Sequence, residues 1–219
     1  MKALWKHLMS FGTWSNSRKN RSQAPRHMPA RRNTRLAVDR LEERMLFAGN
    51  VLASLDAAGV LNIDGDNSAN CVEIEHVKQG SKKYIEVSGC PASNTQINGQ
   101  VGGSFLVLQK KVKGLYVDLD GGNNYLAIGI QSGPTIKGDV HLQMNKGEAH
   151  IEIGSNTVIK KQLTILTGGW DDQVMLNSVT VQEFMHVQTD AGDDDVQIES
   201  SQFANGLGIN TGKDDDKVT

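Results

Sequence analysis

The sequence predicts an all-β protein whose main body is a parallel β-solenoid, of the right-handed β-helix type or a close relative. Five similar segments follow one another in the C-terminal half, each with a short alternating strand, a turn rich in Gly, Asp and Asn, and a second strand. Their equivalent apolar positions are spaced by 25, 23, 22 and 22 residues, a period typical of stacked repeats. Aromatic residues make up only 5% of the chain, which fits short strands and tight turns. The equivalent positions are Val117, Leu142, Ile165, Val187 and Ile209.

The charged residues divide the chain into a basic N-terminal part and an acidic body. Residues 1–49 hold 11 Lys and Arg against 3 Asp and Glu, a net charge of +8, whereas residues 50–219 hold 12 against 22, a net charge of −10. The total of −2 hides this asymmetry. Residues 1–34 are predicted to be a disordered basic leader, and they contain no apolar run long enough to span a bilayer.

Residues 35–49 differ from the leader because apolar residues recur at roughly helical spacing with charged residues between them. We predict a short amphipathic helix that ends at Gly49. By pattern alone this helix lies on a partner, on a membrane surface or on the body of the protein. The apolar positions are Leu36, Val38, Leu41, Met45 and Leu46.

Part of this segment resembles a sorting motif. The run Leu41-Glu-Glu-Arg-Met-Leu-Phe-Ala48, with Arg31, Arg32 and Arg35 before it, is similar to the N-terminal LEPR-XLL-type motif of planctomycete exported proteins. It departs from that motif in having Met-Leu-Phe where Leu-Leu is usual and Glu43 where Pro or Asp is frequent. The resemblance implies an exported protein at the cell surface or outside the cell. The implied sorting residues are Leu41, Glu42, Arg44 and Leu46.

Residues 50–114 are predicted to form a β cap on the solenoid. Alternating apolar runs are separated by Gly- and Asp-rich turns, and the hairpin signals favour antiparallel pairing. A solenoid needs such a cap because an open first rung exposes strand edges. The predicted strands are Val51–Leu55, Val60–Ile63, Val72–His76, Tyr84–Val87 and Phe105–Leu108.

Residues 115–219 are predicted to form the solenoid itself. Apolar residues occupy alternate positions in each repeat, so one strand face points inward and the other outward. Two strands per rung are expected, and Val179–Val181 with Phe184 indicate a third strand or corner in their rung. The rival architecture is a β-propeller, but its blades need about 40 residues each.

The Asp-rich turns are the best candidates for chemistry. Calcium prefers several carboxylate and carbonyl oxygens in flexible geometry, and Gly lets the backbone carbonyls join them. Stacked rungs bring the acids into a column, where their repulsion calls for a cation or for shifted pKa values. The turns resemble the Gly/Asp repeats of RTX-type calcium β-rolls, with a longer period and a divergent turn at Asn145–Glu148. The alternative is that Asp, Asn and Gly serve only as turn formers. The predicted Ca²⁺ ligands are Asp171, Asp172, Asp193, Asp194, Asp195, Asp214, Asp215 and Asp216.

Other chemical groups give weaker signals. Paired acids such as Asp171 and Asp172 are reminiscent of glycan-cleaving β-helices, but neighbouring side chains usually point apart. Trp170 is expected to pack in its turn, with a sugar-stacking role as the alternative. Cys71 and Cys90 are too isolated for a zinc site, and export favours their pairing as a disulfide.

These observations predict an exported or surface-associated solenoid of structural or adhesive type, without enzymatic activity. The alternative is a carbohydrate-active β-helix enzyme, a lyase or hydrolase. The expected partner is a surface glycan or a matrix protein, and no transmembrane segment is expected. Nucleic acid is disfavoured because the acidic body repels phosphate and no aromatic platform accompanies the basic residues.

Overall fold

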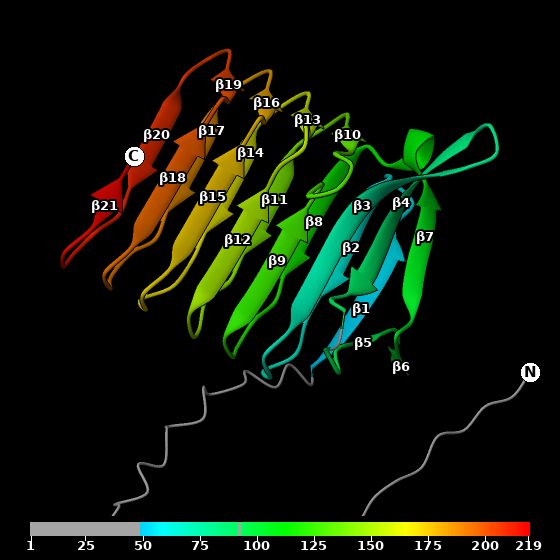
Figure 1. The fold of residues 1–219 in the computed structure, drawn as a ribbon, viewed down its shortest axis with the longest axis horizontal. Helices are drawn as coiled ribbons and strands as arrows, with labels where there is room; N and C mark the ends of the chain where they lie inside the picture. The colour runs from blue at the N-terminus through cyan, green and yellow to red at the C-terminus, as the bar shows by residue number, and fades with distance from the viewer. Residues whose placement is uncertain (1–48, 92) are drawn as a thin grey trace, which may run out of the picture. The chain divides into compact units, whose positions relative to one another are not determined.

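The computed structural model describes residues 49–91 and 93–219, and these form the stack of β-strands drawn in Figure 1. The predicted basic leader, the helix at 35–49 and the sorting residues therefore lie outside the described residues, apart from Gly49. The all-β solenoid predicted from the sequence is confirmed. No helix of the described ranges is long and apolar enough to cross a membrane.

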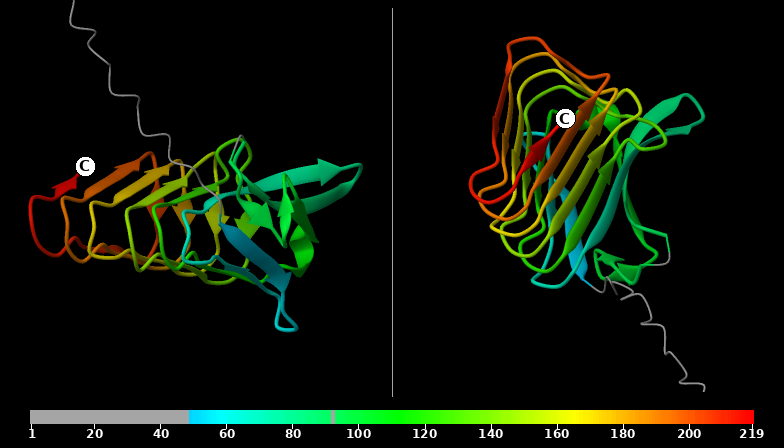
Figure 2. Two further views of the ribbon diagram at one scale, coloured as in Figure 1. Left: turned by 90° about the horizontal axis from the view of Figure 1, so that it is seen from below. Right: turned by 60° about the vertical axis from the view of Figure 1, so that its left-hand side comes forward.

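Four of the five turns of the solenoid, here called rungs, carry three strands where two were expected, and the last described rung carries two. The first strands of successive rungs pair in parallel to form one sheet, the second strands form another, and two-residue third strands form a short sheet between them. The views in Figure 2 show how these three sides enclose the interior. The first strands are β8 (Gly114–Asp118), β11 (Val140–Gln143), β14 (Leu163–Leu166), β17 (Met185–Gln188) and β20 (Leu207–Asn210).

The second and third strands repeat in the same order along the chain. The second strands are β9 (Asn124–Ile128), β12 (Ala149–Ile153), β15 (Gln173–Asn177), β18 (Asp195–Glu199) and β21 (Lys217–Val218). The third strands are β10 (Thr135–Ile136), β13 (Val158–Ile159), β16 (Thr180–Val181) and β19 (Gln202–Phe203). The third strand expected near Val181 is therefore present, and its equivalents occur in three other rungs.

The register of the parallel strands preserves the apolar pattern from rung to rung. Val117 pairs with Leu142, Leu142 with Ile165, and Ile165 with Val187. All four side chains are completely buried. A shift by one residue would move such a set to the outer face, so burial fixes the register. The core is a continuous file of aliphatic side chains through the stack.

A β cap was predicted for residues 50–114, and most strand pairs within this region are antiparallel, as expected. β1 (Asn50–Leu55) pairs with β2 (Val60–Asp64), β3 (Cys71–Gln79) with β4 (Lys82–Gly89), and β4 with β7 (Ser104–Leu108). Three short elements were not expected from the sequence: β5 (Gln96–Ile97), β6 (Gln100–Val101) and the 3₁₀ helix η1 (Gln109–Lys111).

The cap is continuous with the solenoid because two of its strands also pair in parallel. β2 pairs with β8 and β3 with β9, so parallel stacking begins before residue 115. The Cys71–Cys90 disulfide closes the open end of the β3–β4 hairpin, with the two Cα atoms 5.4 Å apart. The pairing expected for an exported chain is confirmed.

Candidate functional site

The turns between the first and second strands of successive rungs stack on one another, and we call this edge of the solenoid the acidic corner. It spans residues 119–123, 144–148, 167–172, 189–194 and 211–216. In Figure 1 these turns lie along the lower side of the stack. Sequence analysis places most of the candidate Ca²⁺ ligands here, and the structure sorts them into two columns.

The inner column consists of the residues immediately before, or at the start of, the second strands. The main-chain N–H of Ala149 donates to Oδ1 of Asp172 (2.7 Å), that of Asp172 to Asp194 (2.9 Å), and that of Asp194 to Asp216 (3.2 Å). Asp172 and Asp194 are each 2% exposed. Each carboxylate therefore reaches back to the preceding rung and satisfies a donor that the sheet ladder leaves free.

The outer column lies one residue earlier and points the other way. The N–H of Asp193 donates to Oδ1 of Asp171 (2.9 Å), and the N–H of Asp215 donates to Oδ1 of Asp193 (3.1 Å). All three side chains are exposed. Adjacent acids therefore point apart, as expected from the sequence. Each carboxylate of the inner column accepts a hydrogen bond from the preceding rung, and each carboxylate of the outer column accepts one from the following rung.

Two of the predicted ligands belong to neither column. Asp195 lies in β18, where its carboxylate accepts from Gln197 and pairs with Lys217 at 3.3 Å. Asp214 occupies the turn position equivalent to Gly192 and has a φ of +84°. Among the described residues, no three His, Cys, Asp or Glu side chains gather in a group that could hold a metal ion. Calcium binding stays a prediction, and the columns give the carboxylates a structural role beside it.

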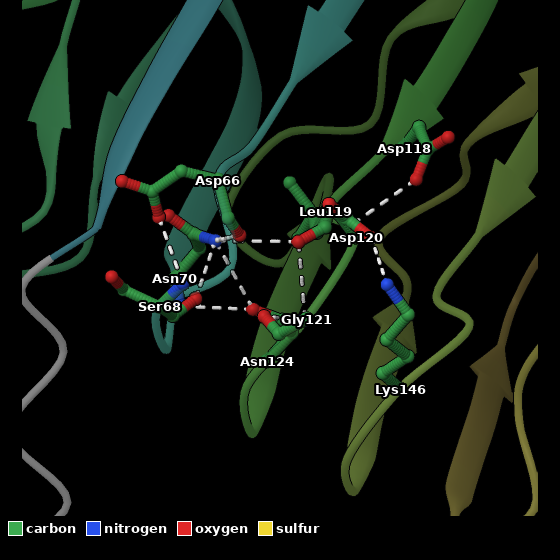
Figure 3. A network of polar contacts seen from close by, with 9 residues as sticks. All are labelled: Asp66, Ser68, Asn70, Asp118, Leu119, Asp120, Gly121, Asn124 and Lys146. Carbon is green, nitrogen blue, oxygen red and sulfur yellow. Dashed lines mark hydrogen bonds and ion pairs between the residues drawn. The ribbon is translucent and has the colours of Figure 1, made fainter.

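Asparagine takes the place of aspartate in the first rungs of the inner column. Oδ1 of Asn124 accepts the N–H of Asn70 at 2.9 Å, in the same pattern as the later Asp residues. Its Nδ2 donates to the carbonyls of Leu119 and Gly121, and Figure 3 shows how these amides cross-link the turns. An uncharged side chain can therefore fill this position.

The columns are interrupted at the turn that departs from the repeat, Asn145–Glu148. Ala149 has no side-chain acceptor, so the N–H of Asn124 donates to the carbonyl of Glu148 instead. In the outer column Asn123 accepts from Glu148, but the described contacts include no bond from the Asp171 N–H to Glu148. The turn that diverges in sequence is therefore also the place where the hydrogen-bonded columns stop.

Burial raises the pKa of two carboxyls of the inner column, those of Asp172 and Asp194. Desolvation raises the pKa of Asp172 to about 7, while the Thr167 hydroxyl and the Ala149 N–H act in the opposite direction. Desolvation also raises the pKa of Asp194, whose Oδ2 accepts a short hydrogen bond from Thr189. Oδ2 of Asp172 and Oγ1 of Thr167 lie buried without a partner in hydrogen-bond geometry. The sequence suggested such shifts from repulsion between stacked acids, whereas burial is their main cause and the neighbouring acids add less.

A second group of titratable side chains lies on the outer face of the sheet formed by the second strands. Glu152 accepts from the Tyr125 hydroxyl (3.0 Å) and contacts Nε2 of His150 (2.8 Å). The rings of Tyr125 and His150 stack at 5.0 Å, and burial raises the pKa of Tyr125 to about 12. Glu152 also lines a groove of about 260 Å³ with Glu199. No sequence motif marks this group, because β9 and β12 bring it together from different rungs.

Trp170 lies in an acidic-corner turn with 57% of its surface exposed. The expectation that it packs into the turn is therefore wrong. Its main chain is closely packed all the same, since Gly192 of the next rung approaches it too closely for any side chain at residue 192.

Comparisons with protein-family models, with curated proteins and with solved structures find no match for this chain.

Proposed function

We propose that this protein is an exported or surface-associated β-solenoid with a structural or adhesive role. The observation that carries the proposal is the stack itself, in which parallel strands keep one register over successive rungs. Such a stack presents long, regular faces to a partner, as solenoids do in general. The Cys71–Cys90 disulfide supports an oxidising compartment.

The sorting role of residues 35–49 is tested by deleting that segment from the full chain. We expect the deletion to hold the product inside the cell, while replacement of residues 12–26 by a neutral linker of equal length leaves export intact. Export is measured by cell fractionation and by oxidation of Cys71 and Cys90. Unchanged secretion of the deletion would remove the sorting role.

We further propose that Ca²⁺ binds at the acidic corner and stabilises the stack. The outer column supports this, because Asp171, Asp193 and Asp215 are exposed and two of them use only Oδ1 as a ladder acceptor. Their remaining oxygens are of the kind that Ca²⁺ prefers. A bound cation would also reduce the repulsion between successive carboxylates.

Thermal unfolding in a calcium titration tests this part of the proposal. We expect the melting temperature to rise with Ca²⁺ and to fall with chelator, since a ligand of the folded state stabilises it. The triple variant Asp171→Asn/Asp193→Asn/Asp215→Asn should lose the response, while Asp139→Asn, an exposed acid outside the corner, should keep it. No shift in either direction would exclude calcium.

A carbohydrate-active enzyme is the second candidate function, favoured by the Glu152 group beside its groove. A carboxyl held by a tyrosine and a histidine is suited to proton transfer. The test is incubation with neutral and acidic polysaccharides, followed by measurement of new reducing ends. Activity that disappears in Glu152→Gln and persists in Glu183→Gln would support the enzyme; no activity towards any substrate would leave the structural role.

A further inference from the structure

More than half of the lysines in the described body collect at the end of the rungs opposite the acidic corner. One groove of about 550 Å³ and another of about 620 Å³ adjoin there and share Lys110 and Lys137. We call the two together the lysine groove. Seven of the 12 lysines between residues 50 and 219 line it: Lys82, Lys83, Lys110, Lys113, Lys137, Lys160 and Lys161.

Unrelated parts of the fold supply these side chains. Lys82 and Lys83 begin β4, Lys110 lies in η1, and Lys137 follows β10. The η1 helix is fixed against β10 by a hydrogen bond from Gln109 Nε2 to the Thr135 carbonyl, 3.2 Å long. The cap and the solenoid therefore meet at this groove. Of its neighbouring elements, β10 is labelled at the upper right of the stack in Figure 1.

The positive charge of the groove is largely uncompensated. Lys137 and Lys160 follow the paired residues Ile136 and Ile159, so they occupy equivalent positions on adjacent rungs. Of the seven groove lysines, only Lys161 has an ion pair within the described residues, with Asp139 at 4.0 Å, and Asp139 is the one acid that lines the groove. Like charges on neighbouring strands destabilise a sheet. In a body with 22 acids and 12 lysines, such a cluster calls for an anionic ligand.

One groove lysine, Lys83, also acts on a histidine of the cap. His76 in β3 has its pKa lowered first by burial and then by Lys83 and Lys78. Inside the groove, the rings of Tyr116 and His141 stack at 5.3 Å and form a half-exposed wall among the lysines. A wall of this kind, beside several cations, fits a ligand that combines ring faces with negative groups.

We propose that the lysine groove binds an acidic polysaccharide, a sugar chain that carries carboxylate or sulfate groups. Residues 49–219 contain no arginine, and lysine is a flexible point charge suited to anions distributed along a chain. Nucleic-acid sites more often use the planar arginine fork, and the net charge of −10 on residues 50–219 opposes a long phosphate backbone. The inference deepens the proposed adhesive role and rests on it for the cellular setting.

Calorimetric titration of the full chain with size-fractionated oligogalacturonates and sulfated galactan oligomers tests the proposal. Binding is expected to weaken steeply as salt increases, since it displaces counterions. Lys110→Gln/Lys137→Gln should lower affinity roughly tenfold or more, as expected for two lost charge contacts. The charge-matched control Lys146→Gln/Lys213→Gln removes two exposed lysines of the acidic corner and should bind within about twofold of the original protein.

The basic residues before residue 49 also attract polyanions, so a local probe is needed. The imidazole resonances of His141, in the groove wall, should shift on binding, while those of His186, two rungs further along the same face, should not. Equal loss of affinity in both double variants, or an unmoved His141, would overturn the proposal. If DNA of equal charge binds more tightly than the sugar oligomers and shifts the His141 resonances, the groove is a nucleic-acid site instead. Normal export with no groove binding would leave the structural role intact.

Discussion

The main-chain N–H of Asp172 donates a hydrogen bond to Oδ1 of Asp194, 22 residues later and one rung further along the stack. The bond is 2.9 Å long and both side chains are buried. A side chain thus replaces a backbone acceptor in the contact between two rungs. The same relationship recurs from Ala149 to Asp216 and makes the inner column a second ladder beside the sheets.

We predict that Asp194→Ala destabilises the protein by about 1–3 kcal/mol, because it leaves the buried Asp172 N–H without an acceptor and removes the short hydrogen bond from the Thr189 hydroxyl. Asp194→Asn should cost much less, since Asn124 fills the equivalent position with an amide oxygen. Urea unfolding gives both values. Asp193→Ala, in the exposed outer column, is the control and should stay within about 1 kcal/mol. Equal losses for Asp194→Ala and Asp194→Asn would contradict the ladder.

The pH dependence of stability should reveal the buried carboxyl of Asp172. Its pKa is raised from 3.8 to about 7 in the folded protein, so the folded state binds the proton more tightly than the unfolded state. The contribution to stability is complete below about pH 4 and is lost as the pH rises through about 7. Denaturant unfolding between these limits should show the slope, and Asp172→Asn should flatten it. If Asp172→Asn keeps the pH dependence of the original protein, a group other than Asp172 causes it.

Gly192 should tolerate no side chain. It has a φ of +128°, and an added Cβ would lie 2.4 Å from the Trp170 main chain. Gly192→Ala is therefore expected to cost more than about 2 kcal/mol, through a strained backbone and a backbone clash. Gly80 also has positive φ, at +60°, but has open space around its Cα, so Gly80→Ala should cost only about 1 kcal/mol. The difference in melting temperature between Gly192→Ala and Gly80→Ala measures the cost of crowding the contact between two rungs.

Reduction of the disulfide between Cys71 and Cys90 should lower the free energy of unfolding by about 3 kcal/mol, as expected for a closed loop of this length. The double variant Cys71→Ser/Cys90→Ser should match the reduced protein. Melting with and without reductant makes the comparison, and the variant itself should not respond to reductant. An original protein whose melting temperature is unaffected by reductant would show that the β3–β4 hairpin is held by its strand pairs alone.

The sequence predicted the stack well because a constant step brings equivalent residues together. The step of 22 residues places Asp172, Asp194 and Asp216 in one column, and strand alternation separates them from Asp171 and Asp193. The contact between Asn70 and Asn124 escaped detection, since the hairpin and loops of the cap separate the two residues by 54 positions. A constant step between residues identifies the column within the repeats, but it does not apply where a long insertion separates two members of the column.

The lysine groove was not foreseen for a related reason. Lys82 and Lys110 come from the cap, and only the spacing of Lys137 and Lys160 follows the repeat. The third strands are also hard to predict, because two residues are too few to show alternation. What sequence reasoning misses here are contacts between the repeating and the non-repeating parts of the chain.

The opposite directions of the two columns bear on how such a protein can grow during evolution. Each rung after Ala149 offers an acceptor to the rung before it and another to the rung after it. A duplicated copy of residues 190–211 would therefore meet matching partners on both sides, and new rungs could be inserted without redesign. A copy of residues 145–167 would carry the gap at Ala149 with it. Gene duplication should thus lengthen this solenoid most readily from its later rungs.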